Sequence, residues 1–280
     1  MPDAGPTAVL PRRPLTVGEL LDSAVLLLRG QARVLVPLAL ALAVGEQLLL
    51  YPLRLAADVE PPVWFVEFDH FGMYWLLLAV GAATEAMIIT LLGNPAARAA
   101  GGALFGRTVG PREVLRPAGA RWGTTVLLTA LVGLVMWVAA LFGPAWFIGF
   151  ALLGAVAPAL VVDRVHPLRA PLRAATLAVR GGGRAGGIRL LGYLSWWIVR
   201  LGLGIGVYYG LDALDLVDRA WAPWLSLAVW AGVNSVAYPA LACLDAVLHL
   251  ETRMRTEGLD IRLSRARTGT PEAVLLAADR

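Results

Sequence analysis

The sequence predicts an all-α integral membrane protein with six transmembrane helices and interfacial amphipathic helices on its cytoplasmic side. Three observations predict this class: an apolar composition, six long apolar stretches, and arginines that gather in alternate connections. Of the 280 residues, 58% are apolar and only 16% are charged, against about 25% charged in an ordinary soluble domain. The composition excludes a soluble enzyme and a disordered chain. The single cysteine, Cys243, excludes an intramolecular disulfide.

Six apolar stretches are long enough for membrane crossings, since a helix needs about 20 residues to cross a hydrocarbon core of about 30 Å. They cover residues 34–55, 71–92, 124–142, 145–162, 188–210 and 224–250. Gly143-Pro144 predicts a tight turn that joins the third and fourth stretches in a helical hairpin. Pro239 predicts a tilt or kink in the sixth.

The arginines predict the orientation. All 24 basic residues are arginines, and 21 of them lie in the segments 12–33, 98–121, 164–189 and 253–280. The two acidic connections on the opposite side carry Asp58, Glu60, Glu67 and Asp69 in one, and Asp212, Asp215 and Asp218 in the other. Because short basic loops stay in the cytoplasm, we expect both termini to be cytoplasmic.

Each basic connection holds a short amphipathic helical pattern. The first begins with a capping box, with Thr16 as the N-cap and Glu19 three residues later.

The sequence predicts a disordered tail at 1–14, a membrane domain at 15–261 and a second disordered tail at 262–280. The membrane domain is interpreted as three units, each an amphipathic helix followed by a hairpin. The alternative is that any protein built from membrane hairpins needs basic amphipathic connections, without duplication.

Three segments carry a resemblance to a known family: residues 13–22 (RPLTVGELLD), 167–181, and 250–260 (LETRMRTEGLD). They resemble the six-helix membrane domain of bacterial glycerophosphoryl diester phosphodiesterases and related standalone membrane proteins. The resemblance extends over most of residues 12–262 and implies an accessory module in the bacterial plasma membrane. The catalytic barrel of about 250 residues has no counterpart in this sequence. Phosphodiesterase activity is therefore not carried over.

Ionisable residues inside the predicted spans are the strongest functional candidates, because charges are costly in lipid. Glu46 and Arg200 each lie roughly 18 Å from the inner ends of their spans, and Glu85 about 11 Å. With Asn234 they form a predicted polar membrane core in which Arg200 bridges one or both carboxylates. Two interpretations stay open: an ion pair that only fixes helix register, and a polar cavity that binds a headgroup, an ion or a proton.

The cytoplasmic arginines predict a second site, a face for lipid headgroups or a protein partner. Its members are Arg169, Arg173, Arg180, Arg184, Arg253 and Arg255. Setting the topology is their alternative role and needs no ligand. No catalytic or metal-binding motif is recognised, so we expect no cofactor and no metal. Nucleic-acid binding is disfavoured because the arginines are spread along a membrane face.

Two functions from different classes follow. The first is a non-enzymatic accessory or scaffold module that acts on partner proteins or lipids. The alternative is a small transporter or lipid-handling permease whose path passes Glu46, Glu85 and Arg200. The expected partners are membrane lipids, anionic ones among them, and a membrane protein or a second copy of the chain. An integral-membrane enzyme without a recognised motif ranks third.

Overall fold

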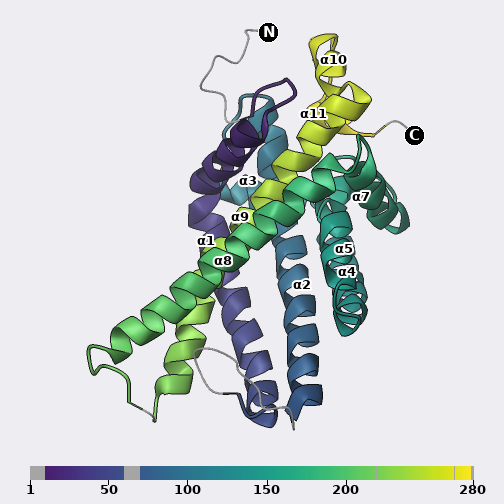
Figure 1. Cartoon of the computed structure of the whole chain (residues 1–280). Coiled ribbons are helices and arrows are strands. Elements are labelled where there is room, and N and C mark those ends of the chain that lie inside the picture. Colours follow the sequence, from purple (N-terminus) through teal and green to yellow (C-terminus); the bar gives the residue numbers. More distant parts are fainter. Residues whose placement is uncertain (1–9, 60–69, 219, 268, 279–280) are drawn as a thin grey trace.

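All regular secondary structure is helical in the part of the chain that the computed structural model describes, which is residues 10–59, 70–218, 220–267 and 269–278. Five helices are long and apolar enough to cross a membrane: α1 (Val17–Ala56), α2 (Phe71–Leu104), α4 (Trp122–Leu141), α8 (Arg184–Asp212) and α9 (Ala222–Glu257). The shorter helices are α3 (Pro111–Leu115), α5 (Ala145–Leu153), α6 (Val156–Val161), α7 (Ala170–Val179), α10 (Leu259–Ser264) and α11 (Glu272–Leu276). Figure 1 shows the long helices as a bundle, with α8 crossing obliquely.

The fourth predicted span is where the structure departs from six long helices. The expected helix over 145–162 is divided into α5 and α6, with Gly154 and Ala155 between them. Pro158 gives the physical reason, because it has no N–H to donate to the carbonyl of Gly154 four residues earlier. The guanidinium of Arg189 lies directly against Gly154. The described residues thus contain five long apolar helices, and the fourth predicted span is broken into two short ones.

The connections place the helix ends in two groups. Gly143, with φ of +63°, makes the tight turn between α4 and α5, a backbone conformation that glycine adopts without strain. Figure 1 shows α10 and α11 at the same end of the bundle as the start of α1, while the end of α8 and the start of α9 lie at the other end. This arrangement keeps the arginine-rich connections together.

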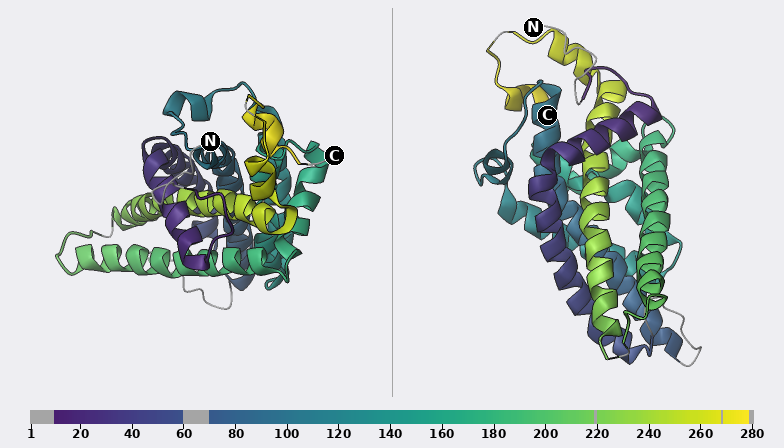
Figure 2. Two further views of the ribbon diagram at one scale, coloured as in Figure 1. Left: turned by 90° about the horizontal axis from the view of Figure 1, so that it is seen from above. Right: turned by 90° about the vertical axis from the view of Figure 1, so that its left-hand side faces the viewer.

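The predicted capping box at the start of α1 is confirmed. The N–H of Glu19 donates to Thr16 Oγ1 at 3.3 Å, and the N–H of Thr16 donates to the Glu19 carboxylate at 2.8 Å. The amphipathic stretch that follows is continuous with the first predicted span, because helix formers fill the sequence between them and Gly30 alone does not end a helix. Figure 2 shows the first part of α1 running obliquely to the remainder.

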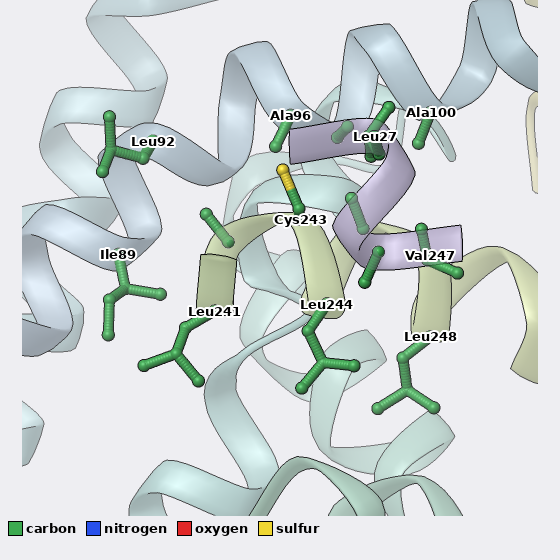
Figure 3. Close-up of a cluster of buried hydrophobic side chains, with 14 of the residues drawn as sticks. Leu27, Ile89, Leu92, Ala96, Ala100, Leu241, Cys243, Leu244, Val247 and Leu248 are labelled. Atoms are coloured by element: carbon green, nitrogen blue, oxygen red, sulfur yellow. The ribbon is translucent and has the colours of Figure 1, made fainter. Parts of the chain in front are cut away.

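The core lies around α9, which packs against α1, α2 and α8. In an apolar 18-residue stretch of α9, 72% of the residues are buried, against 22% in the corresponding stretch of α8. Figure 3 shows side chains from α1, α2 and α9 meeting, with Cys243 pointing toward Ala96. Small residues such as Ala96 and Ala100 on α2 let α9 approach closely. The position of α9 at the centre brings its polar side chains into the protein interior.

The C-terminal segment packs against the bundle, although the sequence predicts a disordered tail over 262–280. Leu276 of α11 is buried, and its carbonyl accepts a hydrogen bond of 2.6 Å from Arg253. An apolar helical turn next to a fixed guanidinium supplies the order that composition alone does not indicate. Of the predicted tail at 1–14, residues 1–9 lie outside the described residues, and Leu10 is buried.

A substitution at the break between α5 and α6 tests how firmly it is packed. A Cβ atom at Gly154 would lie 1.6 Å from Arg189 Cζ. The Arg189 guanidinium is held by Asp245, with 2.7 Å between Nε and Oδ1, and cannot withdraw freely. We expect Gly154→Ala to destabilise the protein by about 1–3 kcal/mol, measured by thermal unfolding in detergent. Gly202→Ala is the control, since no atom lies within 4 Å of its added Cβ. Equal stability of the two variants would contradict the packing.

Candidate functional site

A cavity of about 160 Å³, lined by both polar and apolar side chains, opens between the helices of the bundle. Its charged and amide-bearing lining residues are Glu46, Gln47, Arg54, Glu85, Arg200 and Asn234. Its aromatic lining residues are Tyr74, Trp146, Trp197, Trp230 and Tyr238. The volume holds several water molecules or a small polar group, because one water needs at least about 10–15 Å³ of such space. All four residues of the predicted polar membrane core therefore meet at one cavity.

Glu85 and Arg200 form a buried ion pair between α2 and α8. Arg200 Nη1 donates to Glu85 Oε1, and the hydroxyl of Tyr193 donates to Glu85 Oε2 at 3.3 Å. The guanidinium of Arg200 also lies over the ring of Tyr238, 5.1 Å from its centroid. Of the two carboxylates that the sequence offers to Arg200, the structure pairs it directly with Glu85. The ion pair closes one side of the cavity.

Glu46 has a different environment, although it lines the same cavity and is only 5% exposed. Tyr238 donates to Glu46 Oε2 at 2.7 Å, and Asn234 approaches the same oxygen at 3.4 Å. Thr84 Oγ1 lies 2.9 Å from Glu46 Oε1. These hydrogen-bond partners are all uncharged. The two buried acids of the cavity are therefore not equivalent.

Several members of the site are absent from the sequence prediction. Tyr193 lies seven residues before Arg200, and Tyr238 four residues after Asn234, so helical spacing is the signal that places each on the same face as a predicted residue. Arg54 lies near the outer end of the first predicted span and is not among the predicted site residues. It is buried, because α1 continues to Ala56, and it donates to Gln47 at 2.6 Å.

The lining of the cavity reaches the outer surface of the bundle. Leu78 on α2 and Trp197 on α8 both line the cavity, and each is 44% exposed. Inside, Arg200 Nε, Asn234 Oδ1 and Trp230 Nε1 are buried and meet no hydrogen-bond partner among the described residues. An unsatisfied buried polar group costs about 1–3 kcal/mol. The cavity is therefore suited to water or to a polar ligand.

The six arginines of the predicted cytoplasmic face are mostly engaged within the protein. Arg173 and Arg253 both contact Asp163, at 2.9 and 2.8 Å, and His249 Nε2 lies 2.8 Å from the same carboxyl group. The remaining ion pairs of the face join Arg173, Arg180 and Arg253 to Glu257, and Arg184 and Arg255 to Glu251.

Arg169 is exposed, and the structure places it outside these ion pairs. The acids that hold the other five arginines come from the end of α9 and from the turn after α6, which the sequence alone does not bring together. Among the described residues there is also no cluster of three potential metal ligands.

Asp163 lies at the centre of this inner cluster and has a perturbed acidity. Burial by itself raises the pKa of its carboxyl group, but the charge and hydrogen bond of His249 and the charges of Arg253 and Arg173 outweigh this effect. The result is a pKa of about 2, below the ordinary value of 3.8. Asp163 is thus an ionised anchor for the end of α9.

The fold is that of a helical protein with five helices long and apolar enough to cross a membrane, and with buried ionisable residues gathered at one cavity. The comparisons with known proteins add no closer assignment: no family model matches the chain, and neither a curated protein nor a solved structure does.

Removing one partner of the cavity ion pair tests whether it holds the bundle together. We expect Glu85→Gln to destabilise the protein by about 3–5 kcal/mol, because Arg200 would stay buried without its carboxylate. The double variant Glu85→Gln/Arg200→Gln removes both charges, and we expect it to recover most of the loss. Thermal unfolding in detergent measures both effects. A double variant as unstable as the single one would show that the two charges are not coupled.

The pH dependence of stability tests the inner cluster. Since the pKa of Asp163 is lower in the folded protein than in the unfolded chain, its contribution is full above about pH 4 and is lost as the pH falls toward 2. The shift corresponds to about 2 kcal/mol. We expect Asp163→Asn to destabilise the protein at pH 7 and to remove this part of the acid dependence. Asp215→Asn, at an exposed position, should change neither. If the stability of wild type and of Asp163→Asn falls in parallel as the pH is lowered, the lowered pKa of Asp163 is contradicted.

Proposed function

We propose that this chain is a lipid-handling permease of the bacterial plasma membrane, which binds the polar headgroup of a lipid in the cavity between α1, α2, α8 and α9. The observation that carries the proposal is a cavity that holds charged and amide side chains and whose lining includes the exposed Trp197 at the middle of α8. Trp197 is about 20 Å from either end of α8. Surface at that depth faces lipid, so a headgroup would enter from the membrane.

The proposal includes six crossings, with α5 and α6 together making the fourth. Their 17 residues (Ala145–Val161) extend about 25 Å when helical, slightly less than a hydrocarbon core. The distribution of arginines supports cytoplasmic termini. A broken span next to buried charges is a feature of many transporters. It favours the permease over a purely structural bundle.

The amphipathic helices are proposed to lie at the cytoplasmic membrane surface. Leu168, Leu172 and Val179, in and beside α7, are 80%, 69% and 58% exposed. Exposed leucines on an amphipathic helix insert into the boundary between headgroups and acyl chains. Arg169 lies among them and is free to meet the phosphate of an anionic lipid.

The same exposed face supports a second candidate, a non-enzymatic accessory module that docks on a membrane protein partner or a second copy. The apolar side chains of α7 and the largely exposed surface of α8 are the features that favour it. This candidate predicts a protein partner and gives the cavity no ligand. The lipid-binding function therefore has to be tested at the cavity itself.

Filling the cavity provides the test. Gly81 lines it, and its added Cβ would meet only Leu50, at 3.8 Å, so Gly81→Leu places bulk inside. Gly45→Leu is the matched control on an exposed face of α1, with no atom within 4 Å. We expect wild type and Gly45→Leu to retain a phospholipid selectively in native mass spectrometry, with phosphatidylethanolamine and phosphatidylglycerol as probes. Gly81→Leu should bind it at least about tenfold more weakly, a loss of about 1.4 kcal/mol. Equal retention by all three proteins would refute lipid binding in the cavity.

A further inference from the structure

The hydrogen-bond geometry around Glu46 points to a bound proton: we propose that its carboxyl group is neutral in the resting protein and is the proton-binding site of the cavity. Nothing in the lipid-binding proposal requires this. The inference deepens that proposal, because it gives the permease a group whose charge changes inside the cavity. The protonation itself stands on the contacts of Glu46 with α2 and α9.

Thr84 provides the first step through its single hydroxyl proton. Its Oγ1 lies 2.9 Å from Glu46 Oε1, 3.0 Å from the carbonyl oxygen of Val80 and 3.0 Å from that of Gly81. A hydroxyl group has one proton to donate, and carbonyl oxygens only accept. With an ionised Glu46, three acceptors would share this one proton. A proton on Glu46 Oε1 resolves the conflict, because it is donated to Thr84 and leaves the threonine proton for the helix carbonyls.

The other carboxyl oxygen completes the chain in the same direction. Asn234 Nδ2 donates to the Tyr238 hydroxyl at 2.9 Å, and that hydroxyl donates to Glu46 Oε2 at 2.7 Å. The sequence of donors therefore runs from Asn234 through Tyr238 and Glu46 to Thr84. A neutral carboxyl group, which accepts at one oxygen and donates from the other, fits this position.

The charges around Glu46 lead to the same conclusion. From α2 it faces Glu85, from α8 Arg200, and from α9 Tyr238; on α1 itself Arg54 lies two turns away and donates to Gln47. Arg200 donates directly to Glu85, and Tyr193 adds a second donor to that carboxylate. Glu85 thus holds the contacts that stabilise an ionised acid. Every direct hydrogen-bond partner of Glu46 among the described residues is uncharged, so an ionised Glu46 would have no ion pair in contact with it, and the buried carboxyl group is far less costly neutral.

The division of roles has a functional consequence. Glu85 is fixed as the anion of an ion pair, whereas Glu46 adjoins a cavity large enough for water and exchanges its proton there. Loss of the proton changes the net charge of the cavity by one unit. Buried carboxyl groups of this kind carry protons in many membrane transporters.

Infrared difference spectroscopy of the full-length protein in lipid nanodiscs tests the proposal. A protonated carboxyl group absorbs separately from a carboxylate, and its band shifts in D₂O. At neutral pH we expect the wild type minus Glu46→Gln spectrum to contain such a band. The control is Glu85→Gln/Arg200→Gln, which removes the neighbouring ion pair without changing the net charge. It should keep the Glu46 band.

The outcomes separate clearly. The assignment is overturned if the wild type minus Glu46→Gln spectrum contains no such band. It is also overturned if the Glu85→Gln/Arg200→Gln variant lacks a band that the wild type has. If Glu46→Gln does not fold, Thr84→Val takes its place: a neutral Glu46 loses its acceptor and its band shifts, whereas an ionised Glu46 gives no change in the carboxylic acid region. Phospholipid retention is a separate readout, so failure of lipid binding with the band intact would refute the proposed function and leave the proton site standing.

Discussion

Glu85 on α2 and Arg200 on α8 carry opposite charges into a part of the protein that lipid would surround, and hydrocarbon cannot solvate either charge. Their direct contact compensates both, and it forms only when α8 crosses the bundle within reach of the two long side chains. The ion pair thus constrains the position of the most exposed of the long helices. The position of α8 places Arg200 and Trp197 in the lining of the cavity, whereas the hydrogen bonds of Glu46 come from α2 and α9.

The inner end of the bundle applies the same rule to more charges. Asp163 and Arg253 are both almost fully buried, and they form an ion pair with each other. Arg173 and His249 contact the same carboxyl group of Asp163. Because Arg253 also donates to the carbonyl of Leu276, the cluster fixes α11 against the bundle. Arginines of the connections therefore join the helices of the folded protein.

The sequence predicts this fold well where a single helix decides the outcome. Glu46, Glu85 and Arg200 are visible because charges stand out within apolar stretches, and the capping box of α1 depends only on Thr16 and Glu19. Positions decided by two helices are not visible. Which acid Arg200 meets depends on the crossing of α2 and α8, a property that no spacing along one helix contains.

Hydroxyl groups and short helices are harder to predict for related reasons. Thr84 and Tyr238 are common residues in apolar helices and carry no charge that would mark them, yet they form the hydrogen bonds of Glu46. The division between α5 and α6 depends on Pro158, which the sequence shows, and on the position of Arg189 against Gly154, which it does not.

The most direct test of this account is the depth of the Glu85–Arg200 pair in the membrane. Ile198 lies two residues before Arg200 and is 67% exposed on α8, so a spin label at this position reports the surroundings of the pair without entering the cavity. In lipid bilayers we expect the label to collide often with dissolved oxygen and rarely with a water-soluble nickel chelate, as at the middle of a bilayer. The opposite ranking would place α8 in water and contradict a charge pair held in the membrane interior.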